Sequence, residues 1–341
     1  MPPEIVPDEH GRDARAHTER ILVTGGGGFI GGHLVERLLA DGHRVTVLDN
    51  FSTGDRANLD KVALHPRLEV VHGSVLDEVA LDEVVDSVDR VVHLAAAVGV
   101  RMIMEQPLRS FHTNVRGAEN VLASAHRFRR PVLLMSTSEI YGRNTDDALN
   151  EDSDCLHGPP SVVRWAYSTA KAVDEILGNL YFKERGLPVT IVRLFNTVGP
   201  RQSASYGMVL PALVEQALDG RPITIYGDGL QTRCFLHVDD AVSALCALLH
   251  FPGAAGVTVN VGSREEVSIL ELALRVKVAT GSDSPILHMP YHLVYSDGFE
   301  DMRRRRPDTD RIRQLVGWTP TIRLDEIIAD VVAASRCLVA R

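Results

Sequence analysis

The sequence predicts an α/β protein in which a doubly wound parallel sheet is joined to a smaller C-terminal domain. From Arg20 onward, short apolar runs alternate with stretches of helical periodicity, a pattern typical of parallel strands whose helices cover both faces of the sheet. Beyond Phe195 the segments become shorter and richer in loops, which indicates a second unit. A chain of 341 residues is long enough for two interlocked units of this kind.

The expected sheet has six strands, of which the last closes it. The strands are predicted at residues 21–23, 44–48, 68–72, 90–94, 131–135 and 189–194. The clearest helices are predicted at residues 29–40, 110–129, 167–185 and 210–219. We assign residues 20–195 and 230–257 to the sheet domain, and residues 196–229 and 258–341 to the smaller domain that closes over its edge. Residues 1–19 are polar, contain proline and lack periodicity, so we expect a disordered tail there.

The stretch ILVTGGGGFIG at residues 21–31 joins the first strand to the first helix. Gly25 allows a tight turn, Gly28 lets the backbone approach a pyrophosphate, and Gly31 lets the helix pack closely on the sheet, as in a Rossmann-type dinucleotide-binding unit. The second strand ends in Asp49, about 20 residues further on, where this unit places a carboxylate for the adenosine ribose. Because that carboxylate would repel a 2′-phosphate, we expect NAD rather than NADP. A chance glycine-rich turn would leave Asp49 unexplained.

Further residues at the cofactor are expected from their places at the strand ends. The start of the first helix faces the phosphates, the turn-rich loop after the second strand lies beside the adenosine, and the residues after the third strand border the adenine. Small side chains after the fourth strand suit a backbone that lies against a flat ligand. These residues are Phe29, Ile30, Asn50, Ser52, Thr53, Gly54, Ser74, Val75, Leu94, Ala95 and Ala96.

Composition excludes several classes of function. The formal net charge of −9 argues against general binding to nucleic acid or to anionic membranes. No apolar run approaches the roughly 20 residues that cross a bilayer, and the N-terminus lacks the apolar core of a signal peptide. The four cysteines are scattered, and neither they nor the histidines show metal-ligand spacing, so we expect reduced thiols in a cytoplasmic protein and no metal.

Two groups of side chains indicate catalysis. Tyr167 and Lys171 lie four residues apart in a predicted helix, so they share a face, and a nearby ammonium favours the phenolate that can accept a proton from a sugar hydroxyl. Directly after the fifth strand, Thr137 offers a hydroxyl to the substrate and to Tyr167, and Glu139 places a carboxylate beside the nicotinamide. The alternatives are a surface tyrosine–lysine pair and a helix-capping glutamate.

These segments, together with FNTVGPRQ and YGDGLQTRCFLHVDD, resemble the extended short-chain dehydrogenase/reductase family, the group of sugar-nucleotide epimerases and dehydratases, over nearly all of residues 20–335. Within it, the combination of STSEIYG, RWAYSTAK and FEDMRRRRPD resembles the nucleotide-sugar decarboxylases. The resemblance implies tightly held NAD, Thr137, Tyr167 and Lys171 as catalytic residues, and a UDP-sugar in the crevice. It also implies a homodimer formed through the helices near 110–129 and 167–185.

The reaction that this resemblance implies is decarboxylation of UDP-glucuronic acid to UDP-xylose through a UDP-4-keto-pentose. Ser138 and Glu139 stand where dehydratases acting on dTDP-glucose carry Asp-Glu, so the acid for a departing hydroxyl is missing, although GDP-mannose dehydratases also carry Ser-Glu. By the same resemblance Arg305 reaches the sugar carboxylate, a role that suits a planar guanidinium. Substrate binding is further assigned to Asn196, Arg201, Tyr206 and Arg233, with both arginines expected at the diphosphate. A nucleotide-sugar 4-epimerase, a 4,6-dehydratase and a non-catalytic NAD-binding regulator remain as alternatives.

Overall fold

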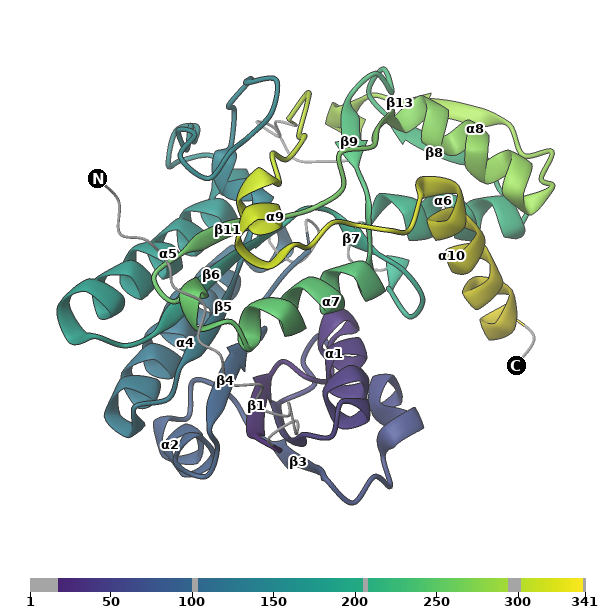
Figure 1. Cartoon of the computed structure of the whole chain (residues 1–341). Coiled ribbons are helices and arrows are strands. Elements are labelled where there is room, and N and C mark those ends of the chain that lie inside the picture. The colour runs from purple at the N-terminus through teal and green to yellow at the C-terminus, as the bar shows by residue number, and fades with distance from the viewer. Residues whose placement is uncertain (1–17, 100–103, 205–207, 294–301, 340–341) are drawn as a thin grey trace.

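A computed structural model describes residues 18–99, 104–204, 208–293 and 302–339 of the chain (Figure 1). Its central sheet has seven parallel strands in the order β11-β6-β5-β4-β1-β2-β3. The strands are β1 Arg20–Thr24, β2 Arg44–Asp49, β3 Leu68–His72, β4 Arg90–His93, β5 Val132–Thr137, β6 Val189–Leu194 and β11 Thr258–Val261. The chain reverses its direction of progress between β1 and β4, and open α/β sheets bind ligands in the crevice at such a point. The predicted fold class is confirmed.

Helices cover both faces of this sheet, which explains why its strands are apolar runs rather than alternating sequences. Ile21 and Val23 of β1 point to one face, and Leu22 between them points to the other. The first face is covered by α1 Phe29–Ala40, α7 Val238–Leu249 and α9 Asp310–Val316. The second face is covered by α2 Glu78–Asp86, α4 Pro107–Phe128 and α5 Ala166–Arg185 (Figure 1).

A second apolar core lies in the smaller part of the molecule, between α6 Val209–Leu218, α8 Ile269–Thr280 and α10 Leu324–Val339. Short strand pairs join it to the rest of the chain. They are β8 Ile223–Tyr226 with β13 Ile286–Met289, β9 Thr232–Cys234 with β12 Glu266–Ser268, and β7 Thr197–Val198 with β10 Leu236–His237. The 3₁₀ turns are η1 Arg56–Val62, η2 Ser138–Tyr141, η3 Val163–Trp165, η5 Pro252–Ala254 and η6 Tyr291–Leu293.

The expectation that the sixth strand closes the sheet is wrong, because β11 pairs with β6 beyond it. This strand has only four residues and carries a fully buried Asn260 in its middle, so it does not look like an apolar run. Asn260 donates to the carbonyl oxygens of Leu149 and Asp308 at 2.9 and 3.1 Å. Residues from 258 onward therefore contribute a strand and helix α9 to the sheet, and the expected boundary at residue 257 does not hold there.

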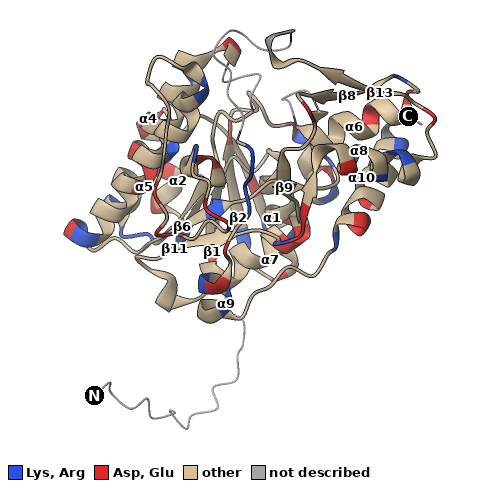
Figure 2. Cartoon of the chain, turned by 90° about the horizontal axis from the view of Figure 1, so that it is seen from above, with Lys and Arg blue, Asp and Glu red and all other residues tan. Residues whose placement is uncertain are grey.

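The start of the described chain is held to the sheet. Residues 1–17 of the predicted tail lie outside the described residues, but Glu19 accepts a backbone hydrogen bond from Arg44, and its carboxylate accepts the Arg90 Nε–H at 2.9 Å. The tail prediction therefore fails at Glu19, which directly precedes β1 and is bound to the start of β2. Figure 2 shows acidic and basic residues interspersed along the outer helices. Within the ranges described, no helix combines the length and the apolar character that spanning a bilayer requires.

Asp240 of α7 fixes the segment that leads to α10. Its Oδ2 accepts the backbone N–H groups of Thr321 and Ile322 at 3.0 and 2.9 Å, and its Oδ1 accepts the Thr321 hydroxyl at 2.9 Å. Both oxygens of this buried carboxylate thus satisfy donors on a neighbouring segment.

We expect Asp240→Asn to lower the free energy of unfolding by about 1–3 kcal/mol, because an amide presents one oxygen where two are needed and leaves a part-buried donor unpaired. Urea denaturation measures the change. The matched control is Asp239→Asn, one residue earlier, whose side chain is 66% exposed and which should change stability little. Equal effects of the two substitutions would contradict this role for Asp240.

Candidate active site

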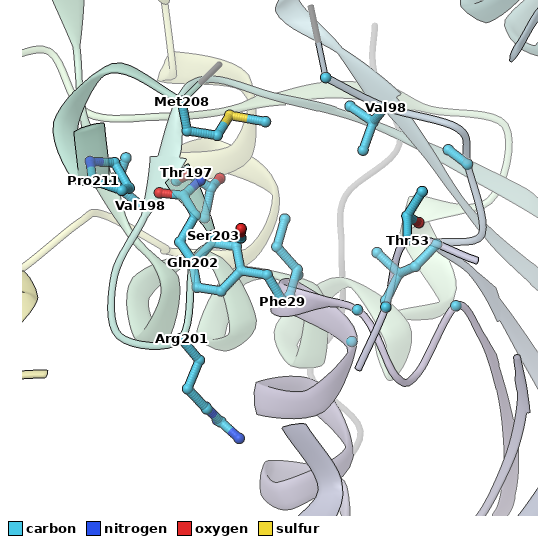
Figure 3. Close-up of a pocket in the computed structure, with 18 of the residues that line it drawn as sticks. Phe29, Thr53, Val98, Thr197, Val198, Arg201, Gln202, Ser203, Met208 and Pro211 are labelled. Carbon is cyan, nitrogen blue, oxygen red and sulfur yellow. Dashed lines mark hydrogen bonds between the residues drawn. The ribbon is translucent and has the colours of Figure 1, made fainter. Parts of the chain in front are cut away.

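One large cavity lies at the carboxyl ends of the strands and measures about 2020 Å³. Single-ligand pockets span roughly 300–1,000 Å³, so this volume has room for a dinucleotide and a second large ligand. Every sequence-predicted site residue that the structure describes lines it, and Tyr206 lies outside the described residues. Figure 3 shows part of this cavity, with Thr53 and Val98 on one side, Thr197 and Met208 on the other, and Phe29 between them near Gln202.

The glycine turn at one wall fits a dinucleotide pyrophosphate. Gly25 has φ +74°, a conformation that side chains rarely adopt, and a Cβ on Gly31 would collide with the Gly25 carbonyl oxygen. Helix α1 begins after Gly28 without a capping side chain, so its first N–H groups are left for a ligand anion. The turn therefore has both the backbone shape and the donors that the phosphates of NAD require.

Asp49 at the end of β2 completes this wall. Its Oδ2 accepts the Gly27 N–H at 2.8 Å and its Oδ1 accepts the Phe51 N–H at 2.7 Å, so it also joins the glycine turn to the next loop. A carboxylate has lone pairs beyond these two bonds, which leaves it able to accept from ribose hydroxyls.

The predicted catalytic hydroxyls meet at the end of β5. Thr137 is its last residue, and its side chain hydrogen-bonds the Tyr167 hydroxyl and accepts the Glu139 N–H at 3.2 Å. Tyr167 lies at the start of α5, and Lys171 follows one turn later on the same buried face. The structure thus brings Thr137, Tyr167 and Lys171 together, as the sequence predicts.

The expected lowering of the pKa of Tyr167 is not found. Burial, followed by the charges of Glu139 and Asp174, raises the pKa of this phenol above its usual value. The Lys171 ammonium that should counteract this effect is instead paired with Asp174, at 3.0 Å between Nζ and Oδ2. Asp174 is itself buried, and burial raises its pKa although Lys171 acts in the opposite direction. Its Oδ1 is buried without a hydrogen-bond partner among the described residues.

Glu139 lies between two guanidiniums. Its Oε1 accepts from Arg305 Nη1 at 2.9 Å, and its Oε2 lies 2.5 Å from Arg164 Nη1. Burial alone would raise the pKa of Glu139, but the charges of Arg164 and Arg305 hold it well below its ordinary value. Glu139 is therefore an ionised carboxylate at the cavity wall, and it is neither exposed nor a mere helix cap.

The residues expected at the substrate fall into two groups. Arg305 also donates from Nη2 to Asn196 Oδ1 at 2.7 Å, and Arg233 donates to the carbonyl oxygens of Thr232 and Met302, so these side chains surround one end of the cavity. Arg201 lies apart and points away from the other labelled side chains in Figure 3. Its Nη1 donates to Glu36 of α1 at 2.6 Å and to the Asn58 carbonyl oxygen. A role for Arg201 at the diphosphate stays a prediction.

A buried polar network fixes α5 against the strand ends. Glu175 binds Arg193 of β6, with 2.7 Å between Oε2 and Nη2, and accepts the Ser136 hydroxyl of β5 at 2.5 Å. Arg193 Nη1 donates to the Tyr141 hydroxyl at 2.9 Å, and Tyr141 donates in turn to Asn260 of β11 at 2.7 Å. The helix that carries Tyr167 and Lys171 is thus joined to β5, β6 and β11 at once.

Sequence reasoning missed Arg164, Asp174 and this network. Arg164 precedes Tyr167 by three residues and Asp174 follows Lys171 by three, so helical spacing could have placed both on the catalytic face. No comparable spacing relates Glu175 to Arg193, which meet only in the folded sheet.

A possible metal-ligand group lies at Glu19, His43 and His250, whose ligand atoms are within 4.8 Å of one another. The two rings are stacked, with centroids 4.9 Å apart and an interplanar angle of 16°, and the carboxylate is bound by Arg90. Stacked rings do not converge on one ion, and the expectation of no metal stays a prediction.

Comparison with known proteins gives the family. The chain is 39% identical over 315 residues to a UDP-N-acetyl-alpha-D-glucosaminuronate decarboxylase from Bacillus cytotoxicus, covering 92% of this chain and 97% of the relative. It is 37% identical to UDP-glucuronic acid decarboxylase 1 of Danio rerio, covering 90% and 70%. DesIV, a dTDP-glucose 4,6-dehydratase from Streptomyces venezuelae solved with NAD bound, is 30% identical with a TM-score of 0.84, covering 93% and 97%. The model of the NAD-dependent epimerase/dehydratase family matches residues 21–262. With this match, the glycine turn and the Thr137–Tyr167–Lys171 group, the chain belongs to the NAD-dependent epimerase/dehydratase family and uses NAD.

Proposed function

We propose that this protein decarboxylates UDP-glucuronic acid to UDP-xylose through a UDP-4-keto-pentose. The observation that carries the proposal is the position of Arg305, a buried guanidinium that lines the cavity and binds Glu139, two residues after Thr137. A guanidinium at this place suits a substrate carboxylate next to the carbon that is oxidised. Two relatives are named as decarboxylases, one of UDP-glucuronic acid and one of UDP-N-acetyl-alpha-D-glucosaminuronate, which supports decarboxylation of a UDP-linked uronic acid.

The first half of the reaction is an oxidation at the 4-position of the sugar. Tyr167 accepts the proton of the 4-hydroxyl. Thr137 hydrogen-bonds both that hydroxyl and the Tyr167 phenol and so orients them for the transfer. Lys171 stabilises the phenolate as it forms. NAD, when bound, supplies the hydride acceptor for this step and the hydride donor for the final reduction.

The second half is loss of carbon dioxide. The 4-ketone is β to the 5-carboxylate, so the C–C bond to the carboxylate breaks, carbon dioxide leaves and the electrons of that bond pass into an enolate. Arg305 holds the carboxylate in position for this cleavage. The enolate takes up one proton from water at C5, which gives the 4-keto-pentose. In the final reduction a hydride adds to C4, and Tyr167 returns its proton to the 4-oxygen. Glu139 is a poor proton donor because its pKa is lowered by Arg164 and Arg305, although burial acts against them. Its contacts instead support a role in which Glu139 holds the guanidiniums of Arg164 and Arg305 in position.

A second substrate deserves the same test, because the 39% identical relative is named for UDP-N-acetyl-alpha-D-glucosaminuronate. The sugar of that substrate carries a carboxylate at the same position, so Arg305 would bind it in the same way. A 4,6-dehydratase of the dTDP-glucose type is disfavoured by Ser138, since a serine replaces the aspartic acid that protonates a departing hydroxyl in those enzymes. Because GDP-mannose dehydratases also carry Ser-Glu here, dehydration is tested alongside decarboxylation.

Incubation of the purified protein with NAD and UDP-glucuronic acid should give products that are lighter by the mass of carbon dioxide, detected by mass spectrometry. Arg305→Ala should lose about 10²-fold or more in kcat/KM, because one carboxylate contact in a closed site contributes several kcal/mol. Arg303→Ala is the matched control, since Arg303 is 71% exposed and pairs with Asp228. Conversion of a neutral UDP- or dTDP-hexose, with no loss from UDP-glucuronic acid, would refute the proposal.

We also propose a homodimer formed through α4 and α5, which pack side by side on one face of the sheet (Figure 1). Leu108 and Phe111 of α4 and Ile176 and Leu180 of α5 are exposed apolar side chains at helical spacing. Two copies of this face would bury them in a four-helix bundle. A cytoplasmic location is proposed as well, and the four free cysteines support it.

Ile176→Glu should convert the protein to a monomer, because it places a charge at the centre of this apolar face. Size-exclusion chromatography with light scattering measures the mass. The control is Leu64→Glu, at a fully exposed leucine outside α4 and α5, which should leave the mass unchanged. A monomeric unsubstituted protein would rule the dimer out.

Asp174→Asn should move the acid limb of the kcat–pH profile to lower pH. The pKa of Tyr167 is raised first by burial, then by the charge of Glu139 and then by that of Asp174. Asp174 also forms an ion pair with Lys171. Removing its charge should therefore lower the pKa of Tyr167. Activity needs the deprotonated phenol and rises with pH through this pKa, so a lower pKa moves the rise downward. Asp152→Asn, at an exposed carboxylate paired with Arg311, should leave the limb in place. An upward shift would contradict the assignment.

A further inference from the structure

The charges at the decarboxylation end of the cavity do not balance. Two guanidiniums, of Arg164 and Arg305, contact the single carboxylate of Glu139. Beside this group Lys171 is paired with Asp174, and Arg233 on the same wall donates to the carbonyl oxygens of Thr232 and Met302 rather than to Glu139. Around Glu139 itself, two guanidiniums thus face one carboxylate, and this excess positive charge matches one substrate carboxylate.

The two arginines are held in different ways. Arg164 lies in η3, directly before α5, and its guanidinium lies 5.9 Å from the centre of the Trp165 ring. It therefore belongs to the same rigid unit as Tyr167. Arg305 comes from the C-terminal segment that crosses the cavity, and the neighbouring Pro307 forms a bridge to Leu149.

The Glu139 carboxylate at the cavity wall needs a counter-ion. Removing the only counter-ion of a buried charge is strongly destabilising, since neither water nor another group replaces it. If Arg305 turned toward the substrate and Glu139 had no other partner, the substrate would have to compete with Glu139 for the same guanidinium. Arg164 removes this competition because it remains on Glu139 Oε2.

We propose that Arg164 is the fixed counter-ion of Glu139, a positioning residue that releases Arg305 to bind the carboxylate of the substrate. This inference rests on the proposed function, which gives the substrate its carboxylate. The complex then holds two guanidiniums and two carboxylates, Arg164 with Glu139 and Arg305 with the sugar. Arg164 acts through Glu139 and Arg305, without a contact to the reacting atoms.

The test compares two ligands that differ in the carboxylate, UDP-glucuronic acid and UDP-glucose. Binding is measured by calorimetry on the full-length, NAD-loaded protein, with Tyr167→Phe in every variant so that neither ligand is consumed. The quantity of interest is the ratio of the two dissociation constants. Arg164→Gln should reduce the preference for UDP-glucuronic acid about tenfold, in the range of couplings between contacting residues, and leave the affinity for UDP-glucose unchanged. Arg164→Lys, which keeps the charge, should retain most of the preference.

The double variant separates this role from a structural one. Glu139→Gln removes the competing carboxylate, so adding Arg164→Gln to it should no longer change the ratio. The inference is overturned if Arg164→Gln weakens both ligands alike, leaves the ratio unchanged, or lowers it equally in the Glu139→Gln background. If Arg164→Gln alone does not fold, Glu139→Gln is compared with the double variant. A lower preference for UDP-glucuronic acid in the double variant then overturns the inference. Absence of any preference for UDP-glucuronic acid before these changes would instead overturn the proposed function, and this inference with it.

Discussion

The buried ion pair between Glu175 and Arg193 is the interaction on which the geometry of the site depends. It joins the helix that carries Tyr167 and Lys171 to the strand beside the one that ends in Thr137. Through Ser136, Tyr141 and Asn260 the same pair extends to β5, η2 and β11. An ion pair of this kind adds little net stability, but loss of either partner leaves an uncompensated charge in the core. Its contribution is to fix α5 at one angle and one height on the sheet.

Electrostatic balance then decides what the site can bind. The Lys171–Asp174 pair keeps the ammonium from acting fully on the phenol, whereas the two arginines at Glu139 leave an excess of positive charge. The region of proton transfer, where the Lys171–Asp174 pair is close to neutral, therefore lies next to a region of carboxylate recognition that is positively charged. A decarboxylase needs both, because the ketone and the carboxylate must sit on neighbouring carbons of one sugar.

The sequence was informative where function depends on local pattern. Apolar runs located the six strands near residues 21–194, and the glycine turn, Asp49 and the Tyr167–Lys171 spacing located the cofactor side of the cavity. It was uninformative where partners meet only through the tertiary fold. The Asn260 side chain hid β11, and Arg201 turns at a positive φ of 72° toward Glu36 of α1. The position of Arg305 in the site was predicted only from the family resemblance, because no local sequence pattern relates it to Glu139, 166 residues earlier.

The late position of β11 in the chain has a practical consequence. The polypeptide leaves the large sheet after β6, returns for α7 and β11, leaves again for β12 and α8, and comes back once more with α9 before it ends in α10. Neither core is encoded by one continuous stretch of the gene. A fragment cut anywhere between β6 and α9 would strip a helix or an edge strand from the large sheet and leave those segments on the other piece. The two cores are therefore not separable as expression units by a single cut in this part of the chain.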